Sequence, residues 1–136
     1  MKFNKLVPEL SVSNIKKSLH FYTKLLGFKI EYSRPEDKFY FLSLEGSQIM
    51  IEEVGKKWFP GRLIKPFGRG VNFQIETRNM EKIIHALKTH NYPIFIKPRD
   101  RQYRKGKTIL LYGEFLVQDP DGYILRFLKS MGKRSV

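Results

Sequence analysis

Residues 114–128 read Glu-Phe-Leu-Val-Gln-Asp-Pro-Asp-Gly-Tyr-Ile-Leu-Arg-Phe-Leu. The parts on either side of its centre are rich in apolar, branched and aromatic side chains, which favours two strands, over 110–118 and 123–128. Asp119-Pro120-Asp121-Gly122 stands between them, and these residue types favour a tight turn. The stretch therefore predicts a strand, a turn and a strand that close the second half of the chain.

The same order of elements precedes this stretch and occurs once more, in the first half. The second half predicts a strand over 70–76, a helix capped by Thr77 or Asn79, a short strand over 93–96, and the closing pair. The first half predicts a strand over 6–12, a helix capped by Ser13 or Asn14 and ended by Gly27, and strands over 28–32, 39–44 and 48–54. A strand, a helix and three strands thus occur twice, and such a repeat decides the fold.

We predict an α+β protein in which two βαβββ modules form a concave mixed-sheet trough. The first module spans residues 1–54, a linker spans 55–69, the second module spans 70–130, and a basic tail spans 131–136. Each module covers one face of its sheet with a helix and leaves the other face bare. A ligand site is therefore expected on the bare faces.

Composition restricts the classes of function. The 136 residues contain no cysteine, which excludes a disulfide scaffold and a cysteine nucleophile and favours a cytoplasmic protein. No apolar run is long enough for a signal peptide or a membrane span, so no membrane partner is expected. The 26 Lys and Arg against 13 acids give a formal charge of +13, which favours anionic partners.

Several motifs resemble the vicinal-oxygen-chelate superfamily of glyoxalases, bleomycin-resistance proteins and extradiol dioxygenases. They are Val-Pro-Glu-Leu-Ser-Val-Ser-Asn at 7–14, Ser-Leu-His-Phe-Tyr at 18–22, Leu-Gly-Phe at 26–28, Phe-Leu-Ser-Leu at 41–44, Gln-Ile-Met-Ile-Glu-Glu at 48–53, and the closing stretch. The resemblance covers nearly the whole chain and is nearest to the bleomycin-resistance branch. It implies the paired βαβββ fold and a homodimer with a ligand cleft at the interface.

The resemblance also implies where enzymes of this family hold a divalent metal. In this sequence those four positions are Val7, Gly70, Met50 and Arg126. Valine, glycine and methionine offer no donor for a hard or borderline cation, and arginine places a positive charge where the metal would lie. We therefore expect no metal, no cofactor and no catalytic residue.

Other possible ligands or bases remain in the sequence. Glu9, Glu52, Glu76 and Glu114 fall on the face predicted to line the trough, where they could pair with Arg126 or form a displaced metal site. His20, His85 and His90 fall on or at the ends of the predicted helices, away from that face.

A set of mostly aromatic side chains is predicted to bind the ligand. The candidates are Phe39, Phe41, Met50, Trp58, Tyr103, Tyr112 and Arg126. Flat rings and a flexible methionine suit a planar molecule, and Arg126 would contact an anionic group. Cations concentrate in 55–70 and 97–107, so a neutral or anionic aromatic ligand is expected and cationic bleomycin is expected to bind poorly.

Three functions follow from these observations. The first is non-catalytic binding of an antibiotic-like aromatic molecule, as in bleomycin-resistance proteins. The second is a glyoxalase- or dioxygenase-like metalloenzyme with a degenerate metal site. The third is a basic nucleic-acid-associated protein, because Trp58, and Tyr103 between Arg101 and Arg104, place rings among cations.

Overall fold

The computed structural model describes residues 1–55 and 59–136 and shows two four-stranded sheets, each with helical segments. The first half forms β1 (Glu9–Val12), α1 (Ile15–His20) continued by a π-helical turn (Phe21–Leu25), β2 (Lys29–Arg34), a 3₁₀ turn (Pro35–Asp37), β3 (Phe39–Leu44) and β4 (Ser47–Glu53). The second half forms β5 (Asn72–Glu76), α2 (Met80–Thr89), β6 (Ile96–Lys105), β7 (Thr108–Gln118) and β8 (Ile124–Ser135).

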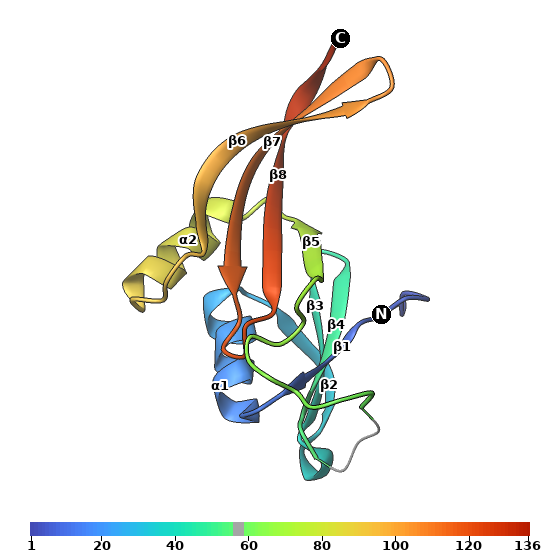
Figure 1. Cartoon of the computed structure of the whole chain (residues 1–136), viewed down its shortest axis with the longest axis vertical. Coiled ribbons are helices and arrows are strands. Elements are labelled where there is room, and N and C mark those ends of the chain that lie inside the picture. The colour runs from blue at the N-terminus through green and yellow to red at the C-terminus, as the bar shows by residue number, and fades with distance from the viewer. Residues whose placement is uncertain (56–58) are drawn as a thin grey trace.

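The two sheets have the same topology, which confirms the predicted pair of βαβββ modules. The strand orders are β1-β4-β3-β2 and β5-β8-β7-β6. In each sheet the first strand runs parallel to the last, and the remaining pairs are antiparallel. Figure 1 shows the first sheet below the second, with α1 and α2 on the same side of the molecule.

The core lies between each sheet and its helix, as the alternation of apolar residues predicts. Leu10 and Val12 of β1 are buried, whereas Glu9 at the start of the strand is exposed. In the second sheet Phe115 of β7 stacks on Phe127 of β8 with ring centres 5.2 Å apart. Both rings are fully buried, so burial of apolar area fixes which face of each strand turns to the helix.

Both helices begin next to the predicted capping residues, and α2 has one further contact that the sequence did not predict. Asn14 caps α1, because its side-chain oxygen accepts the N–H of Lys17 at 3.1 Å. At α2 the N-cap position is Asn79, whose side chain makes no capping bond. Its backbone N–H donates to Oγ1 of Thr77, and Glu45 from the β3–β4 turn accepts the N–H of Arg78. A carboxylate from the first module therefore completes the start of the helix in the second.

Two segments differ from the sequence-based expectation. The short strand expected at 93–96 begins at Ile96 and runs to Lys105, so most of the cation-rich segment 97–107 belongs to a strand. The basic tail expected at 131–136 is part of β8 as far as Ser135. Both segments consist mainly of charged and polar residues without apolar alternation. They are strands because β7 pairs with both, with Thr108 opposite Lys105 and Ser135.

The far ends of these three strands form an extension that we call the distal arm. It comprises residues 100–105 of β6, the turn at 106–107, residues 108–112 of β7 and residues 129–135 of β8. Figure 1 shows the distal arm extending away from both helices toward the C-terminus. At its base Lys129 is bonded to Glu81 of α2, and the rest of the distal arm lies beyond the helices.

The β7–β8 turn connects the two modules. Figure 1 shows it beside α1, where the hydroxyl of Tyr22 donates to Asp119 at 2.8 Å. Asp121 accepts the backbone N–H of Ser13, and Tyr123 donates to the carbonyl of Ser11 at 3.0 Å. Gly122 has a φ of +104°, and a Cβ there would lie 2.4 Å from Pro66 in the linker, so the turn accepts only glycine.

Among the described residues, none of the helices has the length and apolar character that crossing a bilayer requires.

Candidate functional site

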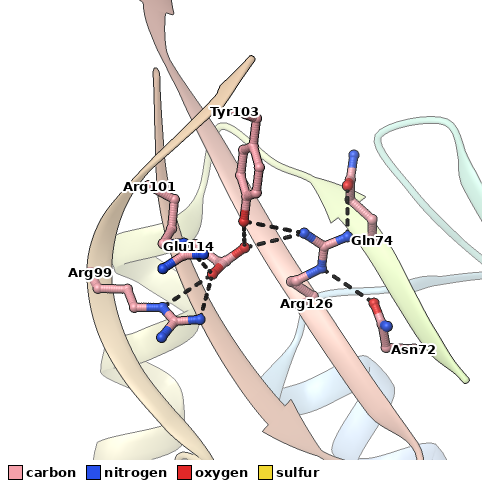
Figure 2. Close-up of polar contacts among 7 residues, drawn as sticks. All are labelled: Asn72, Gln74, Arg99, Arg101, Tyr103, Glu114 and Arg126. Carbon is pink, nitrogen blue, oxygen red and sulfur yellow. Dashed lines mark hydrogen bonds and ion pairs between the residues drawn. The ribbon is translucent and has the colours of Figure 1, made fainter. Parts of the chain in front are cut away.

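The candidate site is a group of seven polar side chains centred on Glu114 of β7. Figure 2 shows them on the face of the second sheet that lies away from α2. The group, called the Glu114 network below, consists of Asn72 and Gln74 from β5, Arg99, Arg101 and Tyr103 from β6, Glu114 from β7, and Arg126 from β8. Strand pairing places them together, since Arg99 stands opposite Glu114 and Gln74 stands opposite Arg126.

Glu114 has almost no contact with solvent, because its side chain is 1% exposed. Its Oε1 accepts the hydroxyl of Tyr103 at 2.6 Å and an Nη1 hydrogen of Arg126 at 3.3 Å. Its Oε2 accepts Nε and Nη2 of Arg99 at 3.2 and 3.1 Å, and Nε of Arg101 lies 3.9 Å away. Both carboxylate oxygens are thus occupied by donors from the neighbouring strands.

The ionised form of Glu114 is favoured despite its burial. Burial raises the pKa of this carboxyl, but hydrogen bonds from Tyr103, Arg126 and Arg99 outweigh burial and hold the pKa below its usual value. A carboxylate that is already ionised and bonded on both oxygens is a weak proton acceptor. Its role is therefore to hold the surrounding cations in place.

Arg126 is held from both sides. In addition to its bond with Glu114, Arg126 donates from Nη2 to Oε1 of Gln74 at 2.9 Å and from Nε to Oδ1 of Asn72 at 3.3 Å. These bonds fix the plane of the guanidinium, which is a quarter exposed to solvent. Arg126 thus presents a fixed, partly accessible cation on the bare face of the sheet.

The network has an excess of positive charge. Three arginines surround one carboxylate, so three positive charges and one negative charge leave a formal +2. The side chains of Arg99 and Arg101 are 43% and 44% exposed. Exposed guanidinium groups beside a buried partner can bind a carboxylate or phosphate through paired N–H donors.

The predicted ring contacts of the first sheet are covered by the chain itself. Tyr32 stacks on Phe41 with ring centres 5.2 Å apart, and Phe3 packs edge-on against the same ring at 5.2 Å. The guanidinium of Arg34 lies 3.9 Å from the ring centre of Phe39. Both phenylalanines are buried. In this conformation they stabilise the sheet and offer no open ring face.

The other predicted contacts fall in different places. Met50 lies opposite Phe41 on β4 and is half-buried. Tyr103 belongs to the network, and the ring of Tyr112 lies 6.0 Å from that of Tyr103. Trp58 lies outside the described residues. Of the seven candidates, Tyr103, Tyr112 and Arg126 are therefore gathered on the second sheet.

The donors do not fit the divalent metal that the family implies. Val7 and Gly70 have no ligating side chain, and Met50 and Arg126 offer a thioether and a cation. No group of three or more His, Cys, Asp or Glu side chains that could hold a metal ion occurs among residues 1–55 and 59–136. Residues of this kind supply no metal chemistry at the family position.

The four glutamates considered as alternative ligands are divided between the two sheets. Glu9 lies opposite Met50 and Glu52 lies opposite Ser11 and Phe39, all on the first sheet. Glu76 ends β5 and lines a hollow of about 510 Å³ beside the β3–β4 turn. Glu114 is bonded to Arg126, which agrees with the predicted pairing of an acid with this arginine.

The histidines lie on the helices, as predicted. His20 ends α1, His85 lies within α2, and His90 follows the end of α2. The rings of His20 and His90 are 5.8 Å apart, at the contact between the modules. None of them belongs to the network.

Sequence reasoning missed Arg99 and Arg101 as site residues. The sequence shows them only as part of a cation-rich segment, although Arg99, Arg101 and Tyr103 stand two residues apart, as side chains on one face of a strand do. That alternation was the available signal. It was weak because the strand it belongs to is an exposed, charged edge.

Comparison with known proteins agrees with this architecture. The model of the Glyoxalase/Bleomycin resistance protein/Dioxygenase superfamily matches residues 2–127. No curated protein sequence matches the chain.

Similar solved structures include an integron cassette protein from the mobile metagenome of V. cholerae, with 21% identity, coverage of 95% of this chain and 97% of that chain, and a TM-score of 0.67. Another is a glyoxalase/bleomycin resistance protein/dioxygenase from Alicyclobacillus acidocaldarius, with 17% identity, coverage of 95% and 92%, and a TM-score of 0.65. A superfamily member from Vibrio splendidus 12B01 is 30% identical over 89% of this chain and 94% of that chain, with a TM-score of 0.41.

The repeated topology and the bare sheet faces define a paired βαβββ protein of the vicinal-oxygen-chelate class. The chain belongs to the Glyoxalase/Bleomycin resistance protein/Dioxygenase superfamily, as the match over residues 2–127 shows.

Proposed function

We propose that this protein binds a small, planar, neutral or anionic molecule on the bare face of its second sheet and breaks no bond in it. The observation that supports this most is Arg126. It stands where the family resemblance implies a metal-ligating acid, and it is bonded to the buried Glu114 instead. An arginine fixed at this place supplies a binding group for an anion in place of a metal.

The chemistry of the network favours binding over catalysis. General acid–base catalysis needs a group that exchanges a proton near neutral pH. Glu114 has a lowered pKa because its bonds from Tyr103, Arg126 and Arg99 outweigh its burial, and both of its oxygens are occupied. A guanidinium does not give up its proton in a protein. The arrangement therefore orients and neutralises a ligand.

The ligand's shape and charge follow from the same residues. Tyr103 and Tyr112 lie 6.0 Å apart on the bare face and offer partly exposed rings for stacking. Arg99 and Arg101 offer exposed guanidinium groups beside them. An aromatic carboxylate matches this combination, whereas a cationic drug meets a formal excess of positive charge.

The proposal includes a homodimer in the cytoplasm, as the family resemblance and the lack of cysteine suggested. Two chains of 16.2 kDa give a dimer of 32.4 kDa, which light scattering after size-exclusion chromatography distinguishes from the monomer. A monomer at all concentrations would contradict this part of the proposal and leave the ligand site untouched.

Calorimetric titration with 1-naphthoate, and with neutral 1-naphthalenemethanol, tests the ligand class. We expect saturable binding of the carboxylate, and at least tenfold weaker binding in Arg126→Met, which corresponds to about 1.4 kcal/mol. Glu114→Gln should bind the carboxylate more tightly than wild type because it removes the competing anion. Arg104→Met is the matched control, since Arg104 is exposed on β6 of the same sheet and points to the opposite face from Tyr103.

Two results would overturn the proposal. One is the absence of saturable carboxylate binding, and the other is equal weakening by Arg126→Met and Arg104→Met. Metal analysis tests the metalloenzyme alternative separately. Dialysis against EDTA should leave 1-naphthoate affinity and melting temperature unchanged, and a stoichiometric divalent ion with a loss of affinity on its removal would favour the enzyme.

A further inference from the structure

Positive charge is concentrated in the distal arm and in the residues that lead into it. Residues 97–107 and 129–136 contain nine Lys and Arg but one acid, Asp100. They are Lys97, Arg99, Arg101, Arg104, Lys105, Lys107, Lys129, Lys133 and Arg134. All of these residues except the half-buried Lys129 are exposed to solvent. Figure 1 shows the distal arm extending beyond the helices.

Several of these cations have no partner of opposite charge. Lys129 is bonded to Glu81 and Arg99 to Glu114. In contrast, Arg104, Lys105, Lys107 and Lys133 form no ion pair within residues 1–55 and 59–136, and all four are exposed. Like charges so close together destabilise the arm by repulsion unless a polyanion neutralises them.

One face of the distal arm combines cations with rings. Strand pairing places Lys105 opposite Thr108, Tyr103 opposite Leu110, and Arg101 opposite Tyr112, so these side chains share a face. Lys133 of β8 lies opposite Leu110 and joins them. The guanidinium of Arg101 lies 5.8 Å from the ring centre of Tyr103. Lysines thus flank two tyrosine rings on one open sheet surface.

We propose that this face of the distal arm binds a single-stranded nucleic acid. Lysines would contact the phosphates, and Tyr103 and Tyr112 would stack on bases, which single strands expose and duplexes hide. The five β6 residues from Arg101 to Lys105 span about 17 Å, enough for a few nucleotides. The inference goes beyond the proposed function, because Lys105, Lys107 and Lys133 take no part in the Glu114 network.

Charge and the exposed rings together favour a single strand over a second copy of the chain, an anionic membrane or a duplex. A second distal arm would bring like charges together, which opposes self-association through this surface. An anionic membrane would attract the cations but would not need paired rings on a sheet. A duplex would contact the lysines and leave the tyrosines without bases to stack on.

Fluorescence anisotropy of a labelled 12-nucleotide oligothymidylate tests the proposal. Wild type should bind at 50 mM salt and weaken steeply as salt rises. The variant Lys105→Gln/Lys107→Gln/Lys133→Gln should bind at least tenfold more weakly, with a salt slope smaller by about 2, since each phosphate contact on a single strand contributes about 0.7. Tyr112→Leu should weaken binding about fivefold or more.

The control variant is Lys16→Gln/Lys17→Gln/Lys24→Gln. It removes the same three charges from exposed positions on α1 and its continuation, which separates location from net charge. It should weaken binding less than twofold. Neither triple variant should melt below wild type, since removing like charges relieves repulsion. Both should bind 1-naphthoate like wild type, so failure of this inference is distinguishable from failure of the proposed function.

Three outcomes would overturn the inference. The first is equal loss of oligonucleotide affinity in both triple variants, which would indicate a diffuse charge effect. The second is tighter binding of the same sequence as a duplex, or of vesicles containing phosphatidylserine, than of the single strand. The third is the absence of any anisotropy change with the oligonucleotide at 50 mM salt.

Discussion

The hydroxyl of Tyr22 donates a 2.8 Å hydrogen bond to Oδ2 of Asp119, which lies 97 residues further along the chain. Both residues are buried, so the bond forms inside the contact between the two modules. The other oxygen of Asp119 accepts the backbone N–H groups of Asp121 and Tyr123, each at 2.9 Å. One carboxyl therefore shapes the β7–β8 turn and attaches it to the first module.

Tyr22→Phe should destabilise the protein by about 1–3 kcal/mol, because it leaves a buried oxygen of Asp119 without its donor. Urea unfolding followed by circular dichroism measures the change. Tyr40→Phe is the control, since Tyr40 is partly exposed and packs at the edge of the core. Its effect should stay within about 0.5 kcal/mol. Equal effects of the two substitutions would show that the bond to Asp119 contributes little.

Asp119 should make the protein more stable as pH falls toward 4. Burial raises its pKa from 3.8 to about 6, despite the hydrogen bonds that favour the ionised form. Between these values the folded state binds more protons than the unfolded state, so this group's contribution to stability decreases as pH rises through the window.

The measurement is the free energy of unfolding of wild type and Asp119→Asn at pH 4, 5, 6 and 7. The difference between the two proteins should shift in favour of wild type by about 2–3 kcal/mol from pH 7 to pH 4. A difference that stays constant, or shifts the other way, would mean that Asp119 is ionised throughout.

Glu114 should show the opposite dependence on pH. Because its folded-state pKa is lowered, its contribution to stability is complete above the unfolded pKa near 4.5 and is lost as pH falls through the folded value. Glu114→Gln should cost about 1–3 kcal/mol at pH 7, and less at pH 3. Glu36→Gln, at an exposed turn position, is the control and should leave the free energy of unfolding unchanged at both pH values. A cost that does not decrease at low pH would exclude an electrostatic role.

Glu45→Ala should destabilise the protein by about 1 kcal/mol, because Glu45 accepts hydrogen bonds from the two residues that precede the N-cap of α2. Its carboxylate accepts the N–H of Arg78 at 2.9 Å and the hydroxyl of the buried Thr77. Hydrogen exchange should show faster opening of α2 with α1 unchanged. Unchanged exchange in α2 would show that Thr77 and solvent suffice as caps.

Metal-free bleomycin should bind poorly, because the drug is cationic and the Glu114 network carries a formal excess of two positive charges. Calorimetric titration at 50 and 300 mM salt measures this. Salt should improve the weak binding by screening the repulsion. A micromolar or tighter dissociation constant would contradict both the charge argument and the preferred ligand class.

Much of the fold was accessible from local patterns. The strand predicted at 39–44 is β3 as observed, and Asn14 caps α1 as its side chain predicts. The long ends of β6 and β8 were not accessible, because their charged residues show no apolar alternation. Among the candidate ligand contacts, Phe39 and Phe41 lie on the predicted face of β3, away from the helix. The sequence of that strand could not show that Tyr32 and Phe3 pack on the ring of Phe41.

The sequence by itself determined the repeated βαβββ order, the buried face of apolar strands such as β3, and the tight β7–β8 turn, because these depend on residues close together in the chain. Tertiary structure alone decided the Glu114 network, in which the bond from Arg126 to Asn72 spans 54 positions. It also decided that the basic segments form an exposed arm. Both depend on strand pairing, which brings distant charges together at distances that no local pattern specifies.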